Sequence, residues 1–211
     1  MLTDFITLKL NDNTSFKFLR SEINISKRDQ TNVFARKNGK TLLTTVSEVK
    51  QTHNKYKKFE NIVMERYSDY LSFPLGDFVL HLKNSGDTFY RSFLNKYGDL
   101  AYCKFSLVDK SIKPLKGLYA YVLGDTVVYI GLTVDTFDRR FNGQGYGTIS
   151  PKNCYIDGQL SNCRMNSMVN DSADMIGLYV CPLIDDDEIV RVERQLIGLY
   201  NPQWNTALRT N

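Results

Sequence analysis

The chain has 211 residues, of which 42% are hydrophobic and 24% are charged, which suits one large globular domain or two small ones. No apolar run approaches the roughly 18 residues of a membrane span. The polar N-terminus lacks the pattern of a secretory leader, so we expect a cytoplasmic protein with no membrane partner. The four cysteines form no Cys-x-x-Cys pair and only two histidines are present, which disfavours a structural zinc site and favours reduced thiols.

Positive charge is concentrated in the N-terminal half of the chain. Residues 1–116 carry 20 Lys and Arg against 12 Asp and Glu, whereas residues 117–211 carry 7 against 11. Lysines gather in the segments KNGK (37–40) and KYKKF (55–59), the second of which interleaves them with aromatic residues. This asymmetry predicts one region that binds a polyanion and another with a different task, although lysines that merely solvate a surface would give the same count.

Residues 1–111 are predicted to form a basic α+β region. Period-two alternation predicts strands, the dipeptide Asn38-Gly39 favours a hairpin turn, and helical spacing of apolar residues predicts a long helix. The expected elements are a hairpin (5–10 and 15–19), a second hairpin (31–46), a helix N-capped by Ser47 (47–73), a strand (77–82), a short helix closed by Gly98 (87–98) and a strand (101–108). The polar stretch 109–116 marks a domain boundary.

Residues 112–211 are predicted to form a second α+β domain, with a small mixed or antiparallel sheet flanked by helices. The acidic start of the last helix complements the helix dipole, and its apolar residues share one face, with Glu193 at the edge of that face. The expected elements are two strands joined by Gly124-Asp125 (118–123 and 126–131), a helix N-capped by Asp135 or Thr136 (135–141), a helix (160–169), a strand (175–183) and a helix (185–200).

Four features of this second domain follow one another in a fixed order. Two strands carry the triplets Gly117-Leu118-Tyr119 and Tyr129-Ile130-Gly131, and a helix with Arg139-Arg140 comes next. A later helix carries Glu193, and the segment NPQWN ends in Asn205. This order resembles the GIY-YIG nuclease family over residues 115–208. The resemblance implies a metal-dependent endonuclease that hydrolyses phosphodiester bonds in double-stranded DNA.

The resemblance also implies roles for the matching residues. Glu193 would hold Mg²⁺ or Mn²⁺, because Mg²⁺ binds through one or two carboxylates and completes its shell with water and phosphate. Arg140 would bind the phosphate, since it stands in the family's register between large apolar residues; Arg139 is the alternate. Asn205 would fix the glutamate or the loop beside it.

Proton transfer is the point at which this sequence departs from the family. Many members carry a histidine four residues after the arginine, and Gln144 stands there instead. Proton abstraction then falls on Tyr119, whose pKa would have to drop beside the metal site and a cation, while Tyr129 orients water or phosphate. Each tyrosine can equally be a half-buried sheet aromatic.

Two sets of residues are candidates for DNA contacts. Lysines of the basic half would neutralise phosphates, and Arg, Asn and Gln at the start of the helix near residue 160 could make bidentate contacts to base edges. These residues are Lys37, Lys40, Lys55, Lys57, Lys58, Gln159, Asn162, Arg164 and Asn166. For the second set, the alternatives are a helix N-cap and ordinary surface polarity.

The short, compact form of the chain, without a visible zinc finger or helix-turn-helix tail, resembles restriction enzymes of the family, and this resemblance implies a sequence-specific type II restriction endonuclease. A structure-specific repair or phage nuclease is one alternative, and a DNA-binding module with a degenerate nuclease domain is another. One active site per chain implies a homodimer or two successive nicks for double-strand cleavage.

Overall fold

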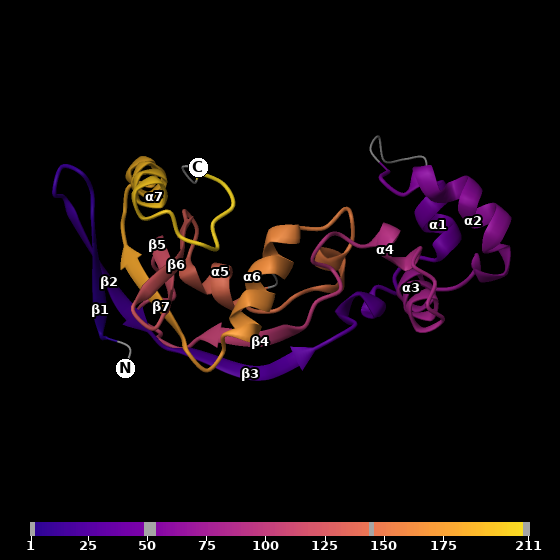
Figure 1. The fold of residues 1–211 in the computed structure, drawn as a ribbon, viewed down its shortest axis with the longest axis horizontal. Coiled ribbons are helices and arrows are strands. Elements are labelled where there is room, and N and C mark those ends of the chain that lie inside the picture. The colour runs from indigo at the N-terminus through magenta and orange to yellow at the C-terminus, as the bar shows by residue number, and fades with distance from the viewer. Residues whose placement is uncertain (1–2, 49–53, 144–145, 209–211) are drawn as a thin grey trace. The chain divides into compact units, whose positions relative to one another are not determined.

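The computed structural model describes residues 3–48, 54–143 and 146–208 (Figure 1). It confirms the expected α+β class. The chain forms two compact units, each assembled from separate stretches: unit 1 comprises residues 1–28, 103–148 and 168–211, and unit 2 comprises residues 29–102 and 149–167. Each unit therefore draws on both sides of the boundary expected at residues 111–112.

Unit 1 is built on a five-stranded sheet with strand order β1-β2-β7-β5-β6. The strands are β1 (Phe5–Lys9), β2 (Ser15–Ser21), β5 (Gly117–Leu123), β6 (Thr126–Thr133) and β7 (Ile176–Pro182). All four neighbouring pairs are antiparallel, which confirms both expected hairpins in this unit. The hairpin between β5 and β6 turns through Gly124 and Asp125, and Gly124 adopts a positive φ of 58°. Strand β6 forms one edge of the sheet.

Helices cover the sheet of unit 1. Helix α7 (Asp186–Tyr200) is N-capped by Asp185, and its buried face of Ile189, Val192 and Leu196 packs against sheet residues such as Leu118 and Ile130. The short helix α5 (Phe137–Asn142) is N-capped by Thr136, whose hydroxyl accepts the Arg139 N–H at 3.2 Å. The Phe141 ring meets Tyr119 edge-on at 5.0 Å.

Three elements, β3 (Ile23–Gln30), β4 (Tyr102–Leu107) and α6 (Leu160–Asp171), cross from one unit into the other along the chain. Strand β3, which the sequence did not predict, pairs with β4 in a two-stranded sheet. Helix α6 begins in unit 2 and ends in unit 1, and it covers the helix expected at residues 160–169.

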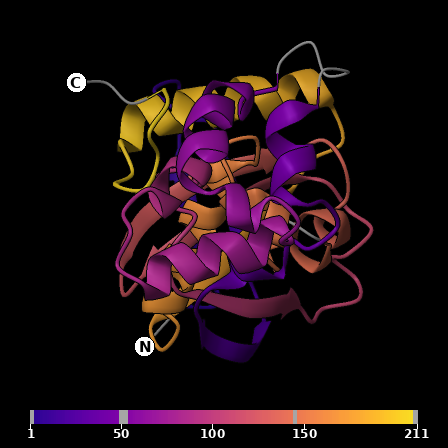
Figure 2. The same ribbon diagram turned by 90° about the vertical axis from the view of Figure 1, so that its right-hand side faces the viewer.

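Unit 2 is mainly helical, and two sequence predictions are wrong there. The hairpin expected around Asn38-Gly39 is replaced by η1 and α1, and the strand expected at residues 77–82 belongs to α3. The elements are η1 (Val33–Arg36), α1 (Leu42–Ser47), η2 (Lys57–Phe59), α2 (Glu60–Arg66), η3 (Ser68–Tyr70), α3 (Leu75–Asn84), α4 (Tyr90–Phe93) and η4 (Pro151–Cys154), where η marks a 3-10 helix. Figure 2 turns this helical unit toward the viewer.

The helix expected from Ser47 to Phe73 is present as three short pieces, η2, α2 and η3. Ser47 does not cap it: Ser47 ends α1, and its hydroxyl donates to the Leu43 carbonyl at 2.8 Å. Residues 49–53 of the expected helix lie outside the described residues. Helix α4 ends before Gly98, which instead permits a close approach to Cys154, because a Cβ there would lie 1.9 Å from the Cys154 carbonyl oxygen.

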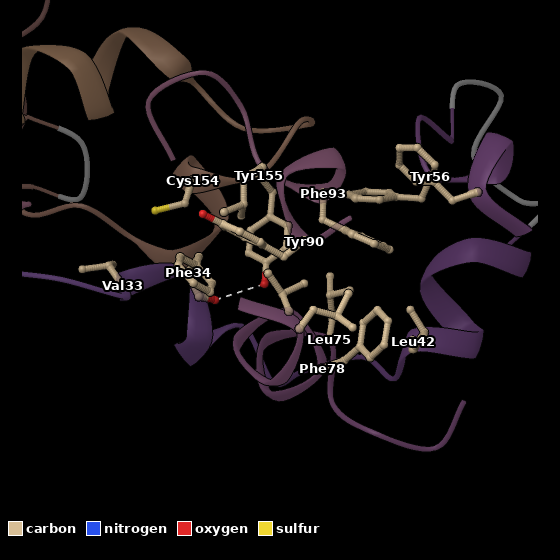
Figure 3. Close-up of a cluster of buried hydrophobic side chains, with 14 of the residues drawn as sticks. Val33, Phe34, Leu42, Tyr56, Leu75, Phe78, Tyr90, Phe93, Cys154 and Tyr155 are labelled. Carbon is tan, nitrogen blue, oxygen red and sulfur yellow. Dashed lines mark hydrogen bonds between the residues drawn. The ribbon is translucent and has the colours of Figure 1, made fainter. Parts of the chain in front are cut away.

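An aromatic core holds unit 2 together (Figure 3). The Phe93 ring stacks on Tyr56 at 6.2 Å and meets Phe78 edge-on at 5.8 Å. The buried Tyr155 hydroxyl donates to the Phe34 carbonyl at 3.1 Å, so the polar tip of this ring is satisfied inside the core. Among the described residues of both units, no helix combines the length and apolar character needed to cross a bilayer.

Candidate active site

A cluster of tyrosines surrounds one arginine in unit 1. The Arg140 guanidinium donates from Nε and Nη2 to the Tyr119 hydroxyl at 3.1 and 3.0 Å, and Nη2 reaches the Tyr146 hydroxyl at 3.5 Å. Its Cζ also lies 4.2 Å from the centre of the Tyr146 ring. Tyr119 has 0% of its surface exposed, and its ring lies 5.9 Å from that of Tyr129 on β6. The two tyrosines of the sequence triplets and Arg140 therefore form one cluster.

The structure requires glycine in each of the two triplets for a different steric reason. A Cβ at Gly131 would lie 2.7 Å from the Tyr119 hydroxyl oxygen and 2.7 Å from the Tyr129 ring. Gly117 has φ +142°, and a Cβ there would lie 2.3 Å from the Cys181 carbonyl oxygen on β7. Gly131 is thus needed so that the two tyrosine rings can pack together, and Gly117 so that β5 can approach β7.

Arg139 and Arg140 occupy different environments. The Arg139 side chain is 80% exposed and forms an ion pair with Asp135. Arg140 is half-buried, and within the described part of the chain it forms no ion pair, so tyrosine hydroxyls are its hydrogen-bond acceptors. Nη1 of Arg140 has no acceptor among the described residues. The charge of Arg140 is therefore partly desolvated, and no carboxylate of the described residues forms a direct ion pair with it.

Glu193 lies at the edge of the buried face of α7, as the sequence predicted, and it is half-buried. Its carboxylate forms no ion pair with any described residue. Burial raises its pKa above the ordinary value, while Arg140, Arg194 and the backbone N–H of Leu132 on β6 act in the opposite direction. The carboxylate thus lies within electrostatic reach of Arg140, near the edge strand.

The carboxylates available near Arg140 determine which metal ion the site could hold. No group of three or more His, Cys, Asp and Glu side chains gathers anywhere in the described residues. A single half-buried carboxylate fits Mg²⁺ or Mn²⁺, since such an ion keeps several waters and takes other ligands from a substrate phosphate. Glu193, whose carboxylate lies within reach of Arg140, is the residue of this cluster that fits that requirement.

Asn205 acts on the backbone of the edge strand. Its Oδ1 accepts the Ile130 N–H at 3.0 Å and its Nδ2 donates to the Ile130 carbonyl at 2.8 Å. The backbone N–H of the neighbouring Trp204 donates to the Val128 carbonyl at 2.7 Å. The segment after α7 therefore holds β6 as a neighbouring strand would, next to Tyr129 and Gly131, and the contact of Asn205 is to this strand rather than to Glu193 or a loop.

The pKa values of the tyrosines do not favour Tyr119 as a general base. Burial, followed by the neighbouring Tyr146 and Tyr129, raises the pKa of Tyr119 well above its ordinary value, and Arg140 lowers it by less. Burial also raises the pKa of Tyr129. The lowered pKa expected for Tyr119 is thus not produced by the side chains of this chain. Tyr119 instead positions Arg140, and Tyr129 is the residue of the two that is partly exposed.

Sequence reasoning missed two tyrosines of the cluster. Tyr146 packs against Arg140, and Tyr121 lies 6.2 Å from Tyr119 with a buried hydroxyl that has no hydrogen-bond partner in the described residues. The alternation of residues 119 and 121 on one face of β5 was a signal for Tyr121. Tyr146 lies in the glycine-rich stretch after α5, which carried no such signal, and Gln144, two residues earlier, lies outside the described residues.

All nine candidate DNA-contact residues belong to unit 2, and so does the whole net charge. Unit 2 contains 13 Lys and Arg against 9 Asp and Glu, whereas unit 1 contains 14 of each. The net charge of +4 therefore resides in unit 2. All five candidate catalytic residues belong to unit 1.

The lysines of the set have different surroundings. Lys57 pairs with Glu60, Lys58 lies over the Phe59 ring, and Lys55 donates to a carbonyl at 3.0 Å; all three are exposed. Lys37 and Lys40 instead line a pocket of unit 2.

The α6 residues expected to read bases do not share an exposed face. Asn162 is 7% exposed and bonds to Gln159 at 2.9 Å, and Asn166 is 0% exposed. This burial leaves the exposed Gln159 and the half-buried Arg164 as the members whose side chains reach the surface. Apolar neighbours in the same helix, such as Met165 and Val169, explain why its asparagines turn inward.

Comparisons of this chain with protein-family models, with curated proteins and with solved structures found no match. Function is therefore inferred from the residues of the cluster and from their chemistry.

Proposed function

We propose that this chain is a metal-dependent endodeoxyribonuclease of the GIY-YIG type, with its hydrolytic centre in unit 1 and DNA-binding lysines in unit 2. A type II restriction endonuclease acting on double-stranded DNA is the favoured form, and a structure-specific repair or phage nuclease is the alternative. Double-strand cleavage would require a homodimer or two successive nicks. A cytoplasmic location is part of the proposal, because all four cysteines are free thiols.

The observation that carries the proposal is the state of Arg140. A partly desolvated guanidinium without a carboxylate partner is unfavourable unless an anion completes its surroundings. Its donors form a rigid fork that matches phosphate oxygens, and Nη1 has no acceptor among the described residues. A phosphodiester placed against this fork would also approach the carboxylate of Glu193.

Each residue then has a defined task. Arg140 binds a non-bridging phosphate oxygen and offsets the charge that develops there, while Tyr119 fixes its orientation. Tyr129, which is partly exposed, orients water or phosphate. Glu193 would hold Mg²⁺ or Mn²⁺, which supplies positive charge to the phosphate and raises the acidity of a coordinated water. Asn205 keeps the edge strand in place.

The test uses plasmid DNA, Mg²⁺ or Mn²⁺, and matched neighbouring variants. Arg140→Gln should lower the cleavage rate by about 10³-fold or more, by analogy with arginines that stabilise phosphoryl transfer. Arg139→Gln should cut like the wild type, because its side chain is exposed and paired with Asp135. Glu193→Ala should abolish cleavage while still binding DNA, whereas Asp187→Ala, at an exposed position of the same helix, should cut and bind DNA like the wild type.

Three outcomes would contradict the proposal or part of it. Equal losses in the two arginine variants would remove Arg140 from the site. Normal cleavage by Glu193→Ala would show that Glu193 is not the metal ligand. A wild-type protein that retains DNA without cutting it under either metal would be a DNA-binding module with a degenerate nuclease domain.

A further inference from the structure

Unit 2 contains a pocket of about 330 Å³ that the proposed hydrolysis does not use. The loop before α1, α1 itself, the start of α3 and residues 152–157 contribute to it, and Tyr56 and Leu75 form its less polar wall. Its volume falls at the lower end of the range for small-molecule sites, about 300–1,000 Å³. Its charged lining consists of three lysines and two carboxylates: Lys37, Lys40, Lys152, Glu48 and Asp157.

The two carboxylates of the pocket already have partners. Glu48 pairs with Lys40, and Asp157 accepts a hydrogen bond from the Tyr56 hydroxyl and pairs with Lys37 at 3.4 Å. The side chain of Lys152 has neither a hydrogen bond nor an ion pair among the described residues. The pocket therefore has one cation in excess, and its acids leave that cation unneutralised.

Lys37 is poorly solvated and loosely bonded. Its side chain is 24% exposed, and its ammonium lies 4.1 Å from the centre of the Tyr155 ring. Its hydrogen bonds to Tyr56 and Asp157 are long, at 3.3 and 3.4 Å. Burial lowers the pKa of Lys37, which reports the same loss of solvent. An anion at this position would replace hydration that the lysine has already lost.

The pocket is held in shape by the core beneath it. The Asn54 side chain donates to the Thr45 and Glu48 carbonyls at 3.0 and 3.1 Å and accepts the Tyr56 N–H at 2.9 Å. Tyr56 stacks on Phe93, as Figure 3 shows. A site whose side chains are already ordered loses little entropy when a ligand binds.

We propose that this pocket binds the phosphate of a nucleotide, either as a free nucleotide or as an unstacked nucleotide of a nucleic-acid strand. Lysine ammonium groups supply the point charges that phosphate requires. The remaining volume, the Tyr56–Leu75 wall and the carboxylate acceptors suit a nucleoside better than a bare anion. The choice of a nucleotide as the phosphate carrier rests on the proposed function.

The test measures binding by calorimetry to the full chain without divalent metal. The probes are a deoxynucleoside 5′-monophosphate, inorganic phosphate and a short single-stranded oligonucleotide. Lys152→Gln removes the free cation. Gly39→Leu places a larger side chain at a residue that lines the pocket, and a Cβ at this position meets no atom within 4 Å. Lys96→Gln is the matched control, since its ammonium lies over the Tyr97 ring and not in the pocket.

The monophosphate should bind the wild type and the control alike. Lys152→Gln should weaken it by about tenfold or more, the effect of one lost hydrogen bond to a charged group, and Gly39→Leu should weaken it by occupying space at the pocket lining. If the oligonucleotide shows this dependence and the monophosphate does not bind, the source is a strand rather than a free nucleotide. Equal affinities of all probes for wild type, Lys152→Gln and Gly39→Leu would overturn the proposal, as would inorganic phosphate binding as tightly as the monophosphate.

Cleavage assays on the same proteins separate the two proposals. If the wild type cuts plasmid but no probe responds to the pocket variants, the pocket proposal fails alone. If the wild type neither cuts nor retains DNA while the monophosphate binds in a pocket-dependent way, the nuclease proposal fails and the pocket proposal stands. Thermal unfolding of Gly39→Leu confirms that the fold is retained.

Discussion

Replacing Asn205 with alanine should loosen the edge strand on which the candidate site depends. The Asn205 side chain makes two hydrogen bonds to Ile130, whose own surface is fully buried. A typical hydrogen bond contributes about 1 kcal/mol, and a buried partner left unsatisfied costs about 1–3 kcal/mol. With both Ile130 groups orphaned, Asn205→Ala should lower the free energy of unfolding by about 2–4 kcal/mol, roughly a 30- to 700-fold change in the equilibrium constant.

The single tryptophan gives a local readout of this change. Trp204 is buried beside Asn205, and its ring lies 6.2 Å from Tyr121, so its fluorescence reports on this part of unit 1. Urea unfolding followed by Trp204 fluorescence should show the lowered free energy of unfolding of Asn205→Ala. Gln203→Ala, at an exposed position of the same segment, should stay within about 0.5 kcal/mol of the wild type.

An aspartate at position 205 sharpens the test. Asn205→Asp retains an acceptor for the Ile130 N–H but sets an oxygen against the Ile130 carbonyl, so at neutral pH it should destabilise at least as much as alanine. Protonation of this carboxylate restores a donor to the Ile130 carbonyl, so the loss in the free energy of unfolding relative to the wild type should shrink as the pH falls. If Asn205→Ala matches Gln203→Ala, or if the aspartate variant shows no recovery in acid, the clamp on β6 is not what the hydrogen bonds indicate.

Three further predictions follow from the charges and hydroxyls. Burial raises the folded-state pKa of Glu193 above its unfolded value, so the native state loses stability as the pH rises through that pKa. Glu193→Gln should therefore raise the urea midpoint of unfolding at pH 7. The difference in midpoint between this variant and the wild type should vanish below about pH 4. Tyr119→Phe should lower cleavage and weaken phosphate binding together, because it frees Arg140, whereas Tyr129→Phe should lower the rate at unchanged affinity; the opposite pattern in kcat and KM would exchange the two roles. Replacing the three lysines of residues 55–59 with alanine should flatten the slope of log K against log salt by about 0.9 for each phosphate that is no longer neutralised, and an unchanged slope would mean that these lysines only solvate the surface.

The sequence predicted unit 1 better than unit 2 for a physical reason. Residues 118–123 are buried on both faces, residues 126–131 are partly buried, and a glycine turn joins the two strands, so local pattern and tertiary environment agree. Residues 77–82 form a short apolar run that fits either a strand or a helix. Tertiary packing favours the helix, because Phe78, Val79 and Leu82 then face a single aromatic core.

The Asn38-Gly39 dipeptide shows a second limit of local signals. A hairpin needs two strands to pair, yet the residues on either side begin and end helices: η1 precedes the dipeptide, and α1 is capped by the Thr41 hydroxyl, which accepts the Thr44 N–H at 3.2 Å. Residue order along the chain likewise could not predict Tyr146 beside Arg140, because this contact depends on how the chain returns after α5. Long-range contacts of this kind leave no local periodicity.

The candidate site keeps groups that a purely structural core would avoid. Arg140 carries a half-buried charge without an ion pair among the described residues, the buried Tyr121 hydroxyl has no partner there, and burial raises the pKa of Glu193. Each feature is unfavourable for folding, and all three lie in unit 1 within one set of mutually perturbing groups, since Arg140 acts on the pKa of both others. Strain that gathers at one place is typical of a functional site, because selection for folding alone would remove it. If that reasoning holds, the gain in stability from Glu193→Gln and the loss of cleavage from Glu193→Ala have one cause, which is a half-buried carboxylate kept without an ion pair near the arginine fork.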